Sequence, residues 1–433
     1  MTRIEPFRGL RYDPERVRGS DVVAPPFDVV DAAQVAALLG QSPYNIAHVE
    51  SCPGETDARY EAAAAALRAW QDAGVLRRDD APLYYAYEQR FAVPASPGRT
   101  EVRRAFFARL EIAPPEAGIV RPHEATLSAA KEDRLKLLRA TRTNVSPIFG
   151  MYADPAAGAR AILDRITAGT PALEATDGRG DSHRLWLIDD PFSIEALTGI
   201  VAASPVTIAD GHHRYQTAIN YLAEREGAGV ATPDDRFVFA GLVAQEEAGL
   251  IVLPIHRLIR AAIVPDDLRA RLDALWQVED AGAASDLEAV RALWARATQA
   301  ATGGSAFGAI GIEPGRLQLL TARNPAAVDA AMPQQLSAAS RALGVLVLNA
   351  TILEPLLGLD AAARAAGTDI AFTENVAEAW HAVQSGQFAL AFLVQPVRAT
   401  QVVEVAAAGE LLPQKSTFFY PKLSTGMVLN PLD

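Results

Sequence analysis

The sequence predicts an α+β fold (mixed α/β) with a mixed sheet, rather than a regular doubly wound parallel sheet. Strand-like and helix-like patterns alternate irregularly, and those in the first third of the chain follow one another as hairpin neighbours do. Of the 433 residues, 50% are hydrophobic, so the chain can build a complete core in two to three domains of roughly 100–200 residues each.

Six segments combine amphipathic periodicity with a helix stop signal. The stretch DARYEAAAAALRAWQDA, for example, ends at Gly74. Alanine is abundant throughout and raises helix propensity everywhere, so periodicity and stop signals weigh more in these predictions. The predicted helices span residues 57–73, 129–140, 155–168, 215–226, 265–275 and 376–385.

Eight apolar or alternating runs, bounded by turn residues, predict strands. In the tail, DIAFTENVAEAWHAVQSGQFALAFLV has the pattern of a strand, a helix and a second strand. The predicted strands span residues 83–91, 103–112, 147–152, 183–188, 206–209, 237–244, 305–310 and 388–394.

Changes in patterning predict three regions along the chain. Residues 1–254 contain most of the chemically distinctive stretches and are the predicted core. Residues 255–344 are rich in Ala, Asp, Arg and Gly without a convergent polar cluster, so they predict an accessory α/β subdomain. Sharp patterning returns in residues 345–433, which we expect to form a C-terminal α/β region that packs back on the core.

Composition favours a small-molecule ligand. The formal net charge of −12 argues against a surface that neutralises nucleic acid or anionic lipid. Cys52 is the single cysteine, which fits a reducing cytoplasm and excludes an intramolecular disulfide. The first residues are charged where a secretory signal needs an apolar region, and no run reaches about 18 apolar residues, so we expect neither export nor a membrane span.

The stretch TIADGHHRYQTA predicts a strand, a tight turn and a helix. An apolar run precedes it, and Tyr215, Ile219 and Leu222 then share one helix face. Gly211 lets the backbone adopt unusual dihedral angles or approach a ligand closely. The free N–H groups of the first helical turn point into the same space, so the turn is suited to an anion.

The side chains of this turn add donors and one acid. Arg214 can grip phosphate oxygens bidentately, and His212 and His213 are donors whose charge is adjustable near neutral pH. Asp210 suits a magnesium ion or a hydroxyl proton. Two alternatives remain: Asp210 simply caps the helix, or the histidines bind zinc, although adjacent residues diverge too far for one metal to take both easily.

A second cluster lies between residues 120 and 152. His123 and Glu124 fall in a polar loop, Lys131 and Arg134 in the following helix, and Asn144 before a strand. The helix charges could form a solvated face, but a loop with an acid and a histidine is not needed to join two elements.

Two further segments carry polar side chains. In VVAPPFDVV the two prolines fix an extended path that presents Asp28, and Asn45 follows in SPYNIAHVE. In the tail PQKSTFFYPKLSTG, Lys415 and Lys422 alternate with aromatic residues. The tail could dock on the body, or its aromatics could wall a nucleotide base while its lysines face phosphates.

Over its whole length the chain resembles the family named domain of unknown function 1015. The resemblance rests on VVAPPFDVV, NIAHVE, PHEATLSAAKEDRLKLLRATRTNVSPIFGMY, SHRLWLI, IADGHHRYQTA and PQKSTFFYPKLSTG. The turn DGHHR is also similar to the strand–turn–helix signature of the ParB and sulfiredoxin superfamily, which includes free serine kinases. That similarity implies a ParB/sulfiredoxin-like nucleotide-binding core, with nucleotide phosphates held by residues 210–214.

These resemblances lead to a first hypothesis: a free serine kinase-like enzyme that transfers a phosphoryl group from ATP or ADP to a hydroxyl, such as that of L-serine, with Mg²⁺. Its candidate residues fall into three groups. They are Asp210, Glu124, His123 and His212 for catalysis, with Asp210 also on magnesium; Gly211, His212, His213, Arg214, Lys131, Arg134 and Lys415 for the nucleotide; and Asp28, Asn45 and Asn144 for the substrate.

Two other hypotheses stay open. A nucleotide-gated regulatory protein in the manner of ParB clamps, which also use CTP, would share the phosphate turn. A metal-dependent hydrolase or nuclease would use His123, Glu124, Asp210, His212 and His213 as ligands, although their spacing matches no established zinc signature.

Overall fold

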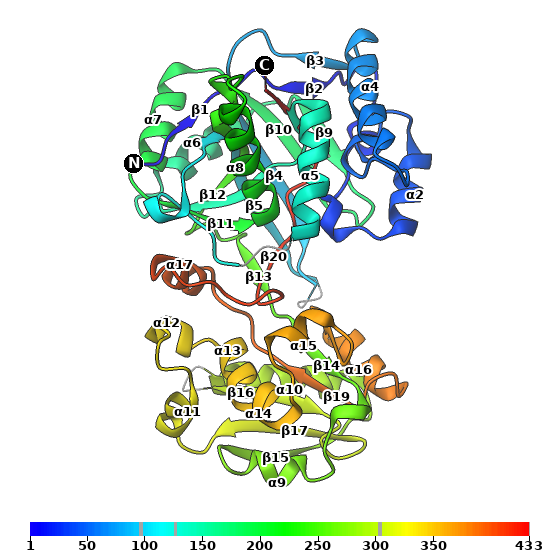
Figure 1. The fold of residues 1–433 in the computed structure, drawn as a ribbon, viewed down its shortest axis with the longest axis vertical. Coiled ribbons are helices and arrows are strands. Elements are labelled where there is room, and N and C mark those ends of the chain that lie inside the picture. Colours follow the sequence, from blue (N-terminus) through cyan, green and yellow to red (C-terminus); the bar gives the residue numbers. More distant parts are fainter. Residues whose placement is uncertain (95–97, 125–127, 302–304, 433) are drawn as a thin grey trace. The chain divides into compact units, whose positions relative to one another are not determined.

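The computed structural model describes residues 1–94, 98–124, 128–301 and 305–432. The chain divides into two compact units (Figure 1). Unit 1 comprises Met1–Leu250 and Pro421–Asp433, and unit 2 comprises Ile251–Tyr420. Unit 2 is therefore inserted into unit 1, and the last residues of the chain return to complete the first unit.

Unit 1 is built on a nine-stranded mixed sheet, which confirms the predicted fold class. The pairs β11/β6 and β12/β8 are parallel, and the others are antiparallel. In spatial order the strands are β6 (Val120–Arg121), β11 (Val206–Asp210), β8 (Ile148–Tyr152), β12 (Phe237–Ala244), β5 (Thr100–Glu111), β4 (Tyr84–Ala92), β10 (Ser182–Ile188) and β9 (Leu173–Thr176), and β1 (Ile4–Glu5) pairs with β5.

The two faces of this sheet are covered differently. Helices α6 (Gly158–Thr167), α7 (Pro191–Ala202) and α8 (His212–Gly227) pack their apolar residues on one face, where Phe106, Ile148 and Ile208 are fully buried. The returning C-terminal segment lies against the other face: a Cβ on Gly241 of β12 would come within 2.4 Å of Leu423. Residues 421–432 are thus part of the core of unit 1.

A second layer of unit 1 lies around α4 (Ala58–Asp72) and α5 (Ser128–Thr141), and α5 runs beside α8 (Figure 1). The side chains of Trp70 and Leu137 lie in the hydrophobic core of this layer. The remaining elements of unit 1 are α1 (Gly19–Val22), α2 (Ala32–Gln41), α3 (Ala47–Glu50), β2 (Leu10–Tyr12), β3 (Leu76–Arg78), β7 (Thr143–Asn144) and β21 (Asn430–Pro431).

Unit 2 contains a six-stranded antiparallel sheet. Its order is β15 (Trp276–Ala283), β17 (Arg316–Ala322), β16 (Ala306–Ile310), β19 (Leu390–Leu393), β14 (His256–Ile259) and β18 (Ile370–Thr373), and β13 (Ile251–Leu253) pairs separately with β20 (Phe418–Tyr420). Strands from 255–344 and from 345–420 share this one sheet, so these two stretches form a single unit.

The helices of unit 2 lie on both sides of its sheet, and its two cores contain the buried side chains of Trp276 and Leu293. They are α9 (Leu268–Leu272), α10 (Leu287–Ala300), α11 (Pro325–Ala331), α12 (Ala338–Arg341), α13 (Gly344–Leu348), α14 (Glu354–Leu357), α15 (Ala361–Ala366), α16 (Val376–Gln384) and α17 (Ala399–Ala407). In the described part of the chain, no helix is long and apolar enough to cross a membrane.

All six predicted helices and eight predicted strands are present. Helix α9 is shorter than the predicted 265–275, and α8 begins at His212, three positions before the predicted 215. The elements that were not predicted include α2, α7, α10, α17, β15 and β17. Helices α2 and α10 are rich in alanine, so discounting alanine hid their periodicity.

Candidate functional site

The turn between β11 and α8 has the strand–turn–helix form predicted for it. Strand β11 ends at Asp210, and Gly211 adopts a left-handed conformation (φ +85°) as the N-cap of α8. A Cβ at Gly211 would lie 3.1 Å from both Ile148 Cα and Arg214 Cζ, so glycine is needed for conformation and for space. Gly211 has no side chain that could cap the first N–H groups of α8.

Asp210 holds two cations at this turn. Arg214 Nη2 donates to Asp210 Oδ2 at 2.6 Å, and Lys422 Nζ donates to Asp210 Oδ1. Burial opposes ionisation, but Lys422 and Arg214 outweigh it and lower the pKa of Asp210 to about 2. Asp210 is therefore ionised near neutral pH. The N-cap of α8 is Gly211, so Asp210 does not cap the helix.

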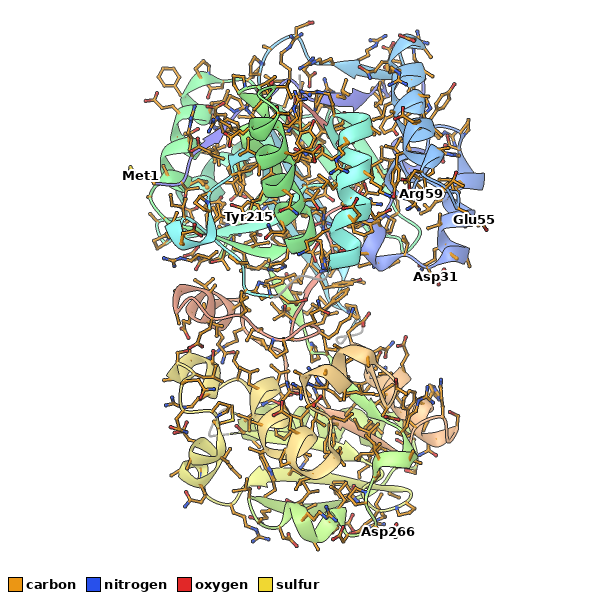
Figure 2. All side chains as sticks on the ribbon, viewed as in Figure 1. Met1, Asp31, Glu55, Arg59, Tyr215 and Asp266 are labelled. Carbon is orange, nitrogen blue, oxygen red and sulfur yellow. The ribbon has the colours of Figure 1, made fainter. Side chains whose placement is uncertain are left out.

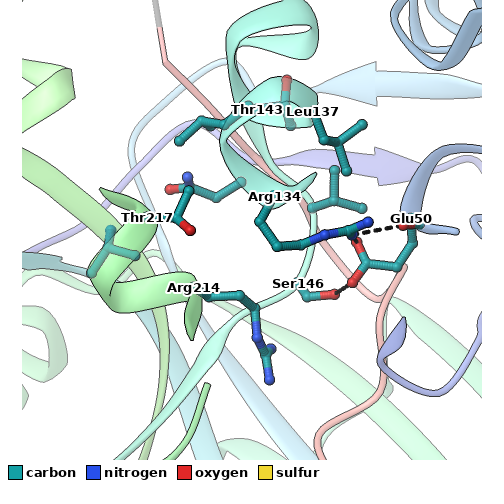
Figure 3. Close-up of a pocket in the computed structure, with 11 residues that line it drawn as sticks. Glu50, Arg134, Leu137, Thr143, Ser146, Arg214 and Thr217 are labelled. Atoms are coloured by element: carbon teal, nitrogen blue, oxygen red, sulfur yellow. Dashed lines mark hydrogen bonds and ion pairs between the residues drawn. The ribbon is translucent and has the colours of Figure 1, made fainter. Parts of the chain in front are cut away.

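Arg214 is largely committed to the protein itself. Besides its bond to Asp210, its Nη1 donates to the carbonyl oxygen of Pro147. Its buried Nε has no hydrogen-bond partner in the described residues. Arg214 lines a cavity of about 50 Å³ together with Arg134, Glu50 and Ser146 (Figure 3). In this arrangement Arg214 braces the turn, and a phosphate would have to displace one of its present partners to be gripped bidentately.

His123 and His212 form a neutral pair beside the turn. Their ring centroids are 4.6 Å apart, and the backbone N–H of His123 donates to His212 Nε2 at 3.3 Å. His123 Nδ1 donates to the carbonyl oxygen of Ile208 at 2.6 Å, so its Nε2 is unprotonated in the neutral ring. Burial is the main cause that lowers the pKa of His123 to about 4 and the pKa of His212 well below its usual range.

His213 faces charged groups from two other segments. Burial lowers its pKa, the charge of Asp28 opposes that change, and the charges of Lys131 and Arg214 reinforce it. The structure thus brings Asp28 and Lys131 into the electrostatic range of the turn. Glu124, which follows His123 directly, is only partly buried.

Arg134 lies deeper, in a network of carboxylates. It donates through Nε to Asp133 Oδ2 at 2.8 Å and through Nη1 to the carbonyl oxygen of Glu50 at 2.7 Å. Glu50 accepts in turn from Ser146 Oγ at 2.5 Å, which also lies 2.7 Å from Thr425 Oγ1. This network ties α5, α3 and the C-terminal segment together, and Figure 3 shows its bonds among Arg134, Glu50 and Ser146.

Asn45 and Asn144 form hydrogen bonds within the protein, and Lys415 belongs to unit 2. Asn45 is fully buried, and its Nδ2 donates to the carbonyl oxygens of residues 21 and 23 at 2.9 and 3.2 Å. Asn144 Oδ1 accepts from the backbone N–H of residue 239 and from Asn430, both at 3.0 Å. Lys415 belongs to unit 2, where its carbonyl oxygen accepts from Arg257 at 3.0 Å, and its role at the phosphate turn stays a prediction.

Lys422 stands out in the tail sequence, but its partner and the groups that hold it are not apparent from the sequence. Gln89 Nε2 donates to the carbonyl oxygen of Lys422 at 2.9 Å, and the N–H of Ser424 donates to Tyr87 Oη at 3.2 Å. Buried Arg103 donates to the carbonyl oxygen of Pro421. The sequence offered one signal for these groups: Gln89 and Arg103 are polar residues among the aromatic residues of two predicted strands.

The turn does not form a magnesium site from protein side chains alone. Within the described ranges no group of three or more His, Cys, Asp or Glu side chains could hold a metal ion. Both carboxylate oxygens of Asp210 are already engaged by cations. Mg²⁺ usually binds through one or two carboxylates together with substrate phosphates, so the magnesium role of Asp210 stays a prediction.

Comparisons with known proteins give a family and several distant structures. The family described as "Protein of unknown function (DUF1015)" matches residues 4–339. A conserved hypothetical protein from Pyrococcus furiosus is 14% identical, with a TM-score of 0.33 over 73% of this chain and 93% of that chain. Free serine kinase in complex with AMP is 13% identical, with a TM-score of 0.33 over 75% of this chain and 92% of that chain. A search of curated proteins gives no match.

Proposed function

The chain belongs to the DUF1015 family of proteins of unknown function, and we propose that it is a nucleotide-dependent phosphotransferase. It would move a phosphoryl group from ATP or ADP to a hydroxyl group of a small molecule, with L-serine as the first acceptor to test. The observation that carries the proposal is the glycine N-cap of α8, beside which Asp210 holds Lys422.

The turn has the donors that a phosphate needs. The first N–H groups of the 16-residue helix α8 are directed toward its N-terminus, where the helix dipole favours an anion. Lys422 supplies a positive charge next to them, and Asp210 keeps that lysine at the turn. Phosphoryl transfer depends mostly on such positioning and charge stabilisation.

The transfer step also needs a base for the acceptor hydroxyl. The hydroxyl oxygen would form a bond to the terminal phosphorus, the bond from phosphorus to the nucleotide oxygen would break, and the hydroxyl proton would pass to a base. His123 is a candidate because its Nδ1–H is bound by Ile208, which leaves Nε2 as the basic atom. Glu124 is the alternative, being partly exposed and adjacent in sequence. Asp210, with a pKa of about 2, is better suited to hold the lysine than to take a proton.

Nucleotide binding followed by phosphorus NMR tests this proposal. Thermal shifts with ATP, ADP and CTP identify the nucleotide, and phosphorus NMR with L-serine and other small hydroxyl compounds then detects the product. We expect Lys422→Met to abolish turnover and Lys136→Met, on the exposed side of α5, to leave it unchanged. Binding of none of these nucleotides, or full turnover by Lys422→Met, would contradict the proposal.

A further inference from the structure

A pocket of about 550 Å³ lies between α2, the start of α4 and the middle of α5 in unit 1. Helix α2 lines it with Ala32, Val35, Ala36 and Leu39, whose spacing places them on one helix face. No residue of α2 is buried, although its sequence is largely apolar. This stripe, which we call the α2 wall, therefore faces an open volume of the size that small-molecule ligands occupy.

The opposite side of the pocket is polar and aromatic. Arg59 Nη2 donates to Asp133 Oδ1 at 2.6 Å, and both side chains keep more than a quarter of their surface exposed, at 29% and 26%. The guanidinium of Arg134 lies 4.0 Å from the ring centroid of Phe27. Figure 2 labels Arg59 and also Asp31, the N-cap of α2. The pocket thus offers apolar walls with hydrogen-bonding groups at their edge.

Asp28 and Arg134 link this pocket to the turn between β11 and α8 (residues 210–214). Asp28 follows Phe27 in the chain, and its charge acts on His213 at the start of α8. Arg134 lines both this pocket and the small cavity that Arg214 lines. A ligand bound here would therefore have the turn of α8 as a neighbouring site.

We propose that this pocket binds the nucleoside part of the nucleotide, with the base against the α2 wall and Phe27. The inference rests on the proposed function and specifies its binding site. A base has apolar faces and polar edges, which match the α2 wall and the Arg59–Asp133 edge, and the guanidinium of Arg59 can donate to base or ribose oxygens. A small hydroxy compound would leave most of the α2 wall uncovered.

The test compares one substitution on two faces of the same helix. Ala36 lines the pocket and Ala37 does not, yet both are exposed. Calorimetry measures binding of ATP and of inorganic triphosphate to Ala36→Glu, Ala37→Glu and the unaltered protein. We expect Ala36→Glu to weaken ATP binding about tenfold or more without affecting triphosphate, and Ala37→Glu to change neither.

The outcomes separate this inference from the proposed function. Equal ATP affinity in Ala36→Glu and Ala37→Glu, with triphosphate bound by both, overturns the nucleoside pocket alone. If the Ala36→Glu variant binds ATP normally but needs more acceptor for half-maximal turnover, the pocket binds the acceptor. That outcome also overturns the inference. Absence of both ATP and triphosphate binding in the unaltered protein removes the proposed function itself.

Discussion

Asp210 and Lys422 lie 212 positions apart in the sequence, yet their side chains form an ion pair at the start of α8. Lys422 is the second residue after the chain re-enters unit 1 at Pro421. The carboxylate and the ammonium are mostly buried, with side-chain exposures of 14% and 11%. The insertion of unit 2 therefore separates, in sequence, two groups that unit 1 requires side by side.

A double-mutant cycle on this pair measures its coupling. Because both charges are mostly desolvated, Lys422→Met should lower the free energy of unfolding by about 2 kcal/mol, less than for an isolated buried pair since Arg214 still compensates Asp210. The cycle with Asp210→Asn, followed by urea unfolding, should show favourable coupling. The exposed pair Lys136–Asp57 is the control and should show none. Additive effects at Asp210 and Lys422 would contradict the interpretation.

Substitution of Gly211 by alanine should destabilise more than the same change at another left-handed glycine. Gly211 and Gly229 both have positive φ, but an added Cβ is crowded only at Gly211. We expect a loss of about 1 kcal/mol for Gly229→Ala and about 2–3 kcal/mol for Gly211→Ala, measured by chemical denaturation. Equal losses would contradict this prediction, because they would show that the backbone near Ile148 can move away from the added Cβ without lowering the free energy of unfolding.

Gln89→Leu should destabilise unit 1 by removing the partner of the Lys422 carbonyl oxygen. Gln89 is fully buried, so its loss leaves that oxygen and Arg103 without one of their bonds. The expected decrease in the free energy of unfolding is about 2 kcal/mol. Gln277→Leu, at an exposed position of β15, is the matched control and should change it by less than about 0.5 kcal/mol. A neutral Gln89→Leu would show that Lys422 is held by other contacts.

Stability should fall as the pH drops from 7 toward 4. The pKa of His123 is lowered from 6.5 to about 4, so the unfolded chain binds a proton at a higher pH than the folded protein does. The stabilisation is complete above the unfolded pKa and is lost as the pH falls through this window, by on the order of 3 kcal/mol.

Urea unfolding between pH 7 and pH 4.5 checks this for unit 1. His123→Gln should flatten the dependence, and His381→Gln, at an exposed position of α16, should leave it unchanged. Some dependence should persist in His123→Gln, because burial also lowers the pKa of His212 in unit 1 and lowers that of His256 in unit 2 to about 3. An identical pH profile for His123→Gln and the unaltered protein would contradict the prediction.

Local signals in the sequence were sufficient for the predicted helices and strands and for the turn. Asp-Gly after an apolar run, followed by residues spaced along one helix face, specifies a strand, a tight turn and a helix within a few residues. The predicted helices and strands are present for the same reason, since their periodicities depend on near neighbours. The sequence by itself thus determined the mixed α+β class and the position of the β11–α8 turn.

Only the tertiary structure decided what surrounds that turn. The partner of Asp210, the clamp on the Lys422 backbone and the single sheet shared by residues 255–344 and 345–420 all depend on which strands pair and where the chain crosses them. The tertiary structure also shows that the buried side chain of Asn45 donates to two backbone carbonyl oxygens, while its role toward a substrate stays a prediction. Such contacts join segments hundreds of residues apart, and local periodicity carries no information about which distant segment will complete a site.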